Sequence, residues 1–136
     1  MIEGDAYFTL MADADGVGFV HCGDGVMVIP LTEDGQVLLA RERSPAFDDE
    51  VLGWRAGRID YLGELHPFKY LTSRQFVFLA RDLSPARLEG DERHPVHTRK
   101  AALGGFLELC AAGELRDAPT IAALCLAQEF LSKERR

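Results

Sequence analysis

Arginine and tryptophan side chains near the middle of the chain are the residues whose types could bind a nucleotide. Arg41, Arg43 and Arg55 carry guanidinium groups, which pair with phosphates through two hydrogen bonds at once. The indole of Trp54 can stack on a base. Each has a plainer interpretation, because surface arginines are often only solvated and a lone tryptophan beside a strand is often part of the core. The pattern leaves both open.

The histidine and cysteine residues do not form a recognisable metal site or a nucleophilic site. The four histidines contain no H-x-x-x-H pair and no Cys/His ligand spacing on one helix, and the three cysteines contain no C-x-x-C pair. The chain also has no G-x-S-x-G segment and no glycine-rich phosphate loop. We therefore expect reduced cysteines and no metal held by histidine.

Length and charge limit the kinds of protein this chain can be. Its 136 residues make a single domain, 1–136, and 22 acidic against 15 basic residues give a formal charge of −7. Such a field repels phosphate backbones, which excludes duplex nucleic acid but still allows a nucleotide held by local arginines. Without a leader pattern or an apolar run of about 18 residues, the chain is expected to be cytoplasmic, with no membrane partner.

Strand patterns dominate the chain as far as Leu83, and helical patterns follow. The strand pairs expected are 6–11 with 17–21, 26–31 with 36–41, and 62–70 with 74–80. The middle pair is continuously apolar, which predicts a hairpin within a covered sheet. Glycines in the segment 53–57 interrupt the strand signal. We expect one helix from about Lys100 to Ala112 and another beginning after Asp117 as N-cap, with Pro119 in its first turn.

The order of five segments resembles that of successive blocks in the Nudix hydrolases. The segments are 26–31, 37–43, 52–60, 88–92 and 117–124. None is specific alone, but in this order they cover nearly the whole chain. The subgroup that it resembles most is the ADP-ribose and ADP-sugar pyrophosphatases, including those that hydrolyse several ADP compounds. This resemblance implies an α/β fold, the Nudix-like α/β/α sandwich with a mixed β-sheet.

The motif that defines Nudix hydrolases is missing. That motif, G-x5-E-x7-R-E-U-x-E-E-x-G-U with U aliphatic, forms a helix whose glutamates hold Mg²⁺ or Mn²⁺ against a diphosphate. Gly57 matches its first glycine, but Gly63 stands where the first glutamate belongs, and no R-E-U-x-E-E segment follows. We interpret this as a clean deletion of about one helix, with the strands on both sides kept. The expected sandwich therefore lacks its catalytic helix.

The same resemblance supplies weak candidates for a residual site. Glu64 echoes the Gly-Glu pair of the motif one residue out of register, and Asp60 with Glu64 could serve as improvised metal ligands. Asp91 and Glu92 match a loop that can carry a catalytic acidic residue in related pyrophosphatases. In the plainer interpretation, Glu64 is a solvated strand residue and the other two belong to an acidic surface loop. The positions that match the family's substrate cleft are Arg41, Arg43, Trp54 and Arg55.

Two functions stay open at this point. In the first, the missing metal ligands leave a Nudix-type protein without normal metal-dependent hydrolysis, which acts as a nucleotide-binding or interaction module for an ADP-sugar or a related ligand. In the second, an active nucleoside-diphosphate-sugar hydrolase uses Mg²⁺ or Mn²⁺ at a non-standard site. Loss of a four-turn helix uncovers roughly several hundred Å² of apolar sheet, so we also expect a homodimer, which is common among related pyrophosphatases.

Overall fold

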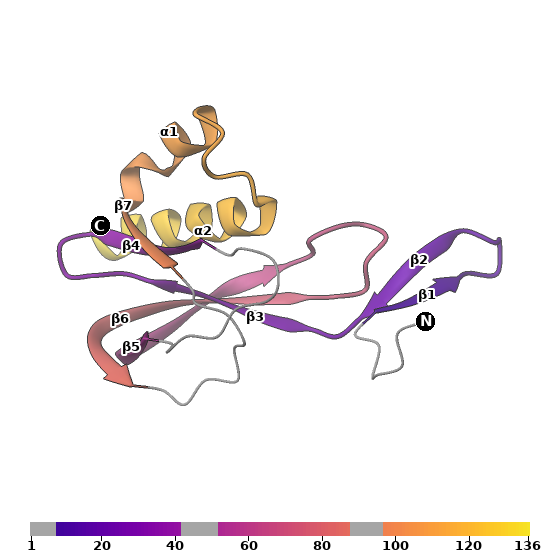
Figure 1. Cartoon of the computed structure of the whole chain (residues 1–136), viewed down its shortest axis with the longest axis horizontal. Helices are drawn as coiled ribbons and strands as arrows, with labels where there is room; N and C mark the ends of the chain where they lie inside the picture. Colours follow the sequence, from indigo (N-terminus) through magenta and orange to yellow (C-terminus); the bar gives the residue numbers. More distant parts are fainter. Residues whose placement is uncertain (1–7, 42–51, 88–96) are drawn as a thin grey trace.

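Seven strands, a 3-10 turn and two helices make up the part of the chain that the computed structural model describes, residues 8–41, 52–87 and 97–136 (Figure 1). They are β1 Phe8–Ala12, β2 Gly18–Cys22, β3 Gly25–Pro30, β4 Gln36–Arg41, β5 Leu52–Leu65, β6 Gln75–Arg87, β7 His97–Ala102, η1 Leu103–Gly105, α1 Phe106–Ala111 and α2 Ala118–Glu134. Within these residues, neither helix is long and apolar enough to cross a membrane.

The central sheet is mixed, as the resemblance implied. Strand β6 lies in the middle, parallel to β3 on one side and antiparallel to β5 on the other. Two further strand pairs, β1 with β2 and β4 with β7, are antiparallel. The β1–β2 hairpin confirms the first predicted strand pair, and it extends away from the helices beyond one end of the central sheet (Figure 1).

The predicted hairpin of 26–31 with 36–41 is wrong in its pairing. Strand β3 pairs with β6 and β4 pairs with β7, and only a single bridge between Leu31 and Val37 joins the two segments beside their turn. The parallel register with β6 sets Ile29 opposite Leu79, and both side chains lie in the core. Tertiary pairing thus overrides the local turn signal that favoured a hairpin.

Strand β5 is longer than the sequence pattern indicated. The segment 53–57, which we expected to interrupt the strands, lies within β5 and pairs with β6 as far as Arg87. A Cβ placed on Gly57 would lie 3.0 Å from the Cβ of Asp82 on the neighbouring strand. The glycine therefore permits close approach across the ladder and does not break the strand.

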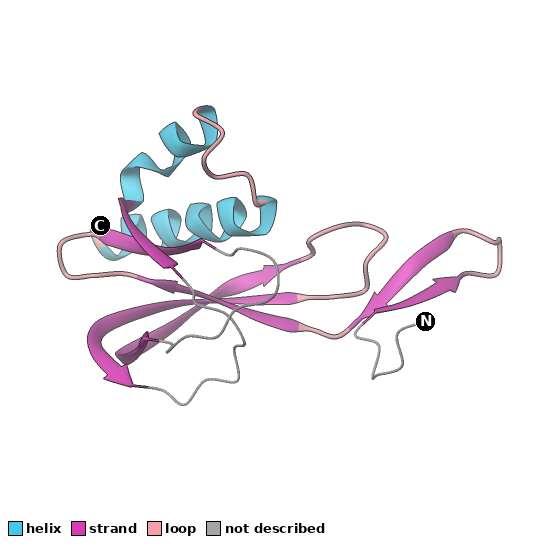
Figure 2. Ribbon diagram, viewed as in Figure 1, coloured by secondary structure: helices cyan, strands magenta, loops and turns pink. Residues whose placement is uncertain are grey.

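Both helices lie on one side of the central sheet (Figure 2). The start of the second helix is confirmed, because the Asp117 carboxylate accepts a 2.9 Å hydrogen bond from the Thr120 amide. The first helix begins later than expected, since Lys100 to Ala102 belong to β7 and pair with β4, and α1 starts at Phe106. Phe106, Leu79 and Leu124 are fully buried in the core formed on this side of the sheet.

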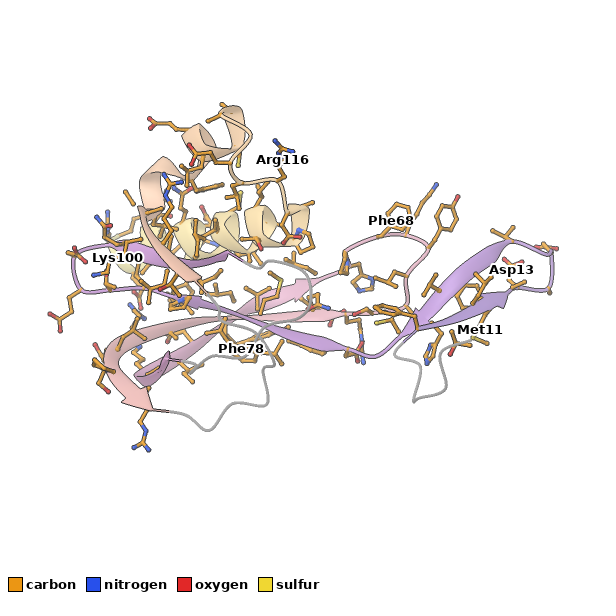
Figure 3. All side chains as sticks on the ribbon, viewed as in Figure 1. Met11, Asp13, Phe68, Phe78, Lys100 and Arg116 are labelled. Atoms are coloured by element: carbon orange, nitrogen blue, oxygen red, sulfur yellow. The ribbon has the colours of Figure 1, made fainter. Side chains whose placement is uncertain are left out.

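The other side of the central sheet carries exposed apolar residues, and no described helix or strand lies over it. Val26 and Val28 on β3 are 65% and 49% exposed, and Ile59 and Tyr61 on β5 are 63% and 55% exposed. Figure 3 shows Phe78 on this side, away from both helices, and its ring lies 5.3 Å from that of Tyr61. The continuous apolar pattern predicted a covered sheet, whereas β3 is exposed on this side, as expected for a sheet that has lost a helix.

Candidate functional site

The position of the missing motif is occupied by uninterrupted strand. Gly57 and Glu64 both lie within β5, and the residues between them pair with β6 except at one bulge, where Leu62 has no partner. Gly63 follows the bulge with φ +150°, a conformation that favours glycine, and it faces Leu126 of α2. No loop and helix stand between the two ends of the motif region.

Asp60 points to the helix-covered side of the sheet, where two arginines hold its carboxylate. Arg81 on β6 donates to Oδ2 at 2.5 Å, and Arg58 on β5 donates to Oδ1 at 3.0 Å. The Asp60 side chain is only 17% exposed. Hydrogen bonds from Arg81, and then from Arg58, hold the pKa of Asp60 below its ordinary value. Its carboxylate is thus ionised and already engaged by two cations.

The same arginines reach the end of α2. Arg81 donates to Glu134 at 2.7 Å and Arg58 donates to it at 3.0 Å, while the Arg81 guanidinium lies 5.7 Å from the centre of the Phe130 ring. The hydrogen bond from Arg81 also lowers the pKa of Glu134. We name Arg58, Asp60, Arg81 and Glu134 the ion network. It ties the last turn of α2 to β5 and β6.

Glu64 lies on the other side of the sheet, opposite Phe76 in the β5–β6 register. Its carboxylate is 2.9 Å from Nε2 of His66. At the same end of the sheet, Arg74 makes a two-pronged contact with Asp24 and lowers the pKa of that carboxyl. The structure therefore does not bring Asp60 and Glu64 together, because the sheet separates them.

The residues expected to contact a nucleotide come from two different sheets. Arg55 is exposed and lies opposite Ser84, and the neighbouring Trp54 lies on β5 opposite Pro85. Arg41 ends β4 in the separate β4–β7 pair. Outside the described residues are Arg43, Asp91 and Glu92. Within the described ranges, no three His, Cys, Asp or Glu side chains gather as a metal site.

The ion network escaped prediction from the sequence. Arg81 and Glu134 are 53 positions apart, and no local spacing links a mid-sheet arginine to the last turn of a helix. The one available signal was Arg58-x-Asp60, in which alternate residues of a strand share a face. That signal predicts a local ion pair but not its partners on β6 and α2.

Comparisons of the sequence and of the structure with known proteins agree with the Nudix-like fold. No family model matches the chain. The ADP compounds hydrolase NudE of Escherichia coli (strain K12) is 25% identical over 139 residues, covering 83% of this chain and 74% of that protein. A crystal structure of an ADP compounds hydrolase superposes with a TM-score of 0.72 at 22% identity, covering 98% of this chain and 91% of the other. The chain is therefore similar in sequence to an ADP compounds hydrolase and has the Nudix-like α/β/α fold.

Proposed function

We propose that this chain is a Nudix-fold module that binds a nucleotide or another protein and lacks the normal metal-dependent hydrolysis of its relatives. The observation that carries the proposal is the continuous strand β5, which runs through the position of the catalytic helix. A diphosphate carries negative charge that a bound divalent cation must neutralise before water can attack. Without the glutamates of that helix, the described residues offer no cluster to hold the cation.

The alternative, an active nucleoside-diphosphate-sugar hydrolase, needs a non-standard Mg²⁺ or Mn²⁺ site. The carboxylates proposed for it include Asp60 and Glu64, which lie on opposite sides of the sheet. A metal at Asp60 would also have to displace two guanidinium groups. These two observations favour the module over the hydrolase, and Asp91 and Glu92 remain the carboxylates on which the hydrolase would depend.

A nucleotide ligand is supported by the relative named for its action on ADP compounds. We propose that Arg41, Arg43, Trp54 and Arg55 contact this ligand, the guanidinium groups at the diphosphate and the indole at the base. The protein would then bind an ADP-sugar or a similar compound without cleaving it. Its expected assembly is a homodimer that covers the exposed face of the central sheet, and its expected location is the cytoplasm.

Calorimetric titration with ADP-ribose tests the binding role. We expect the affinity to be equal with Mg²⁺ and with EDTA, because the ligands that would couple binding to a metal are missing. Arg55→Ala is expected to weaken binding about tenfold, since a hydrogen bond to a charged group contributes about 1.5 to 3 kcal/mol. The matched control is Lys100→Ala, which removes an exposed cation from β7 and should leave the affinity unchanged.

Two results of the titration would count against nucleotide binding as proposed. Affinity that appears only with Mg²⁺ or Mn²⁺ would point to an intact metal site. A complete absence of heat at high ligand concentration would leave only the protein-interaction role.

A further inference from the structure

Among the described residues, the side of the central sheet that faces away from the helices has an apolar middle and charged ends. We name as the open face the residues Val26, Val28, Ile59, Tyr61, Phe76 and Phe78. The exposed fractions of its β3 and β5 residues are all about one half or more. Monomeric proteins rarely leave so many large apolar side chains together in water. The open face therefore has the composition of an interface, and its ends indicate the partner.

Charges of opposite sign flank the open face along β5. Arg55 lies at one end and Glu64 at the other, and both are exposed. They point to the same side as Ile59 and Tyr61, because alternate residues of a strand share a face and the bulge at Leu62 shifts Glu64 back into step. A strand that is positive at one end and negative at the other is complementary to a reversed copy of itself.

Strand β6 carries a second pair with the order reversed. Asp82 lies opposite Gly57, near Arg55, while Arg74 lies at the end that holds Glu64 and has its guanidinium 5.4 Å from the centre of the Phe76 ring. Arg74 is already paired with Asp24, so this second pair is the weaker of the two. When β6 is stacked on an antiparallel copy of itself, unlike charges therefore meet at each end, as they do for β5. The polarity of β5, with the weaker one of β6, favours a second copy of the chain over an unrelated partner.

We propose that two copies pack open face to open face, related by a twofold axis. The axis lies in the interface, runs perpendicular to the strands, and crosses β5 between Ile59 and Tyr61. This arrangement rests on the homodimer proposed above. It stacks each β5 on the partner's β5 in the opposite direction, and each β6 likewise. Arg55 then meets the partner's Glu64, and Asp82 approaches the partner's Arg74, which keeps its contact with the partner's Asp24. In the middle, Ile59 packs against the partner's Tyr61.

The dimensions of the face suit such a dimer. From Arg55 to Glu64 the strand spans roughly 30 Å, and three strands are about 14 Å across. Two such faces together bury on the order of 1,000 Å², at the lower limit for specific interfaces. With the axis between Ile59 and Tyr61, the two residues of each charged pair do not lie directly opposite each other. They are displaced by about two residues, roughly 7 Å along the strand, a distance that an arginine side chain can span. We therefore expect a reversible dimer with a dissociation constant in the micromolar range.

Charge reversal at the two ends of β5 tests this arrangement. Arg55→Glu and Glu64→Arg each place like charges at both ends of the interface, so each variant is expected to self-associate at least about tenfold more weakly than the wild type. A 1:1 mixture of the two variants restores both attractive pairs, because the first then carries only negative charges at these positions and the second only positive ones. We expect the mixture to form heterodimers within a few-fold of wild-type affinity.

Sedimentation equilibrium from about 1 to 100 μM measures these affinities at concentrations that bracket a weak interface. The matched controls are Lys100→Glu and Glu108→Arg, which reverse exposed charges on β7 and α1 and should leave self-association unchanged in each variant and in their mixture. Thermal unfolding of every variant checks that it is folded, and the recovery of dimers in the mixture is itself proof that both variants are competent.

The outcomes separate this arrangement from the proposals on which it rests. A wild-type protein that stays monomeric at 100 μM overturns both the homodimer and its geometry. A wild-type dimer that survives both single variants, or variants whose mixture stays monomeric, overturns the geometry alone. The mixture also separates the two roles proposed for Arg55. Recovery of dimers depends on opposite charges at positions 55 and 64, whereas nucleotide binding does not depend on the charge at position 64.

Discussion

Replacing Phe106 with alanine is expected to lower the free energy of unfolding by about 3 to 5 kcal/mol, the cost typical of removing a buried phenyl ring. The side chain is fully buried at the start of α1, within the core that also contains Leu79 and Leu124. Its loss leaves a cavity that the sheet and α2 can close only in part. Because small domains are stable by only about 5 to 15 kcal/mol, this variant should be close to unfolding at ordinary temperature.

Urea denaturation followed by circular dichroism measures this loss. The control is Leu107→Ala, one residue further along the same helix, where the side chain is 62% exposed. A surface change of this kind is expected to alter the free energy of unfolding by no more than about 0.5 kcal/mol. Equal effects of the two substitutions would mean that Phe106 is not part of the core.

The ion network should make stability depend on pH, and Arg81→Leu should remove much of that dependence. Asp60 and Glu134 have pKa values below their ordinary values of 3.8 and 4.5 in the folded chain, chiefly because Arg81 donates to both. A lowered folded pKa contributes stability that is present above the unfolded pKa and is lost as the pH falls through the folded pKa. The wild-type protein should therefore lose stability as the pH falls below about 4.5.

Arg81→Leu is expected to destabilise the protein at pH 7 by roughly 1 to 3 kcal/mol, because it leaves the half-buried Asp60 carboxylate with only one cation. Urea unfolding at pH 7 and at pH 3 gives both quantities. We expect the difference between variant and wild type to shrink at pH 3, where the carboxyls take up protons. Arg58→Leu removes the more exposed arginine, and the pKa of Asp60 depends on it less, so its effect should be smaller. A difference that is the same at both pH values would exclude an electrostatic origin.

The parts of the fold that the sequence predicted correctly are those determined by local signals. The turn at Asp13 to Gly16 lies between two short apolar runs, and β1 with β2 forms the expected hairpin. Asp117 with Pro119 marked the start of α2 because an N-cap and a first-turn proline act within three residues. The ordered blocks across the chain predicted the mixed sheet.

Long-range pairing explains what the sequence did not predict. Strand β3 takes β6 as its partner across more than forty positions, so the turn between β3 and β4 was a misleading guide. Gly57 seemed to break a strand, whereas its missing side chain makes room for Asp82 on the neighbouring strand. For the candidate site, Asp60 and Glu64 are close in sequence, but a strand bulge and the pleat direct them to opposite sides of the sheet.

Release of AMP from ADP-ribose in the presence of Mg²⁺ or Mn²⁺ tests the central claim most directly. The continuous strand at the position of the catalytic helix predicts no release above the rate without protein, with either metal and at any protein concentration. Metal-dependent release of AMP that disappears when Glu92 is changed to glutamine would contradict this account and establish a hydrolase with a non-standard metal site.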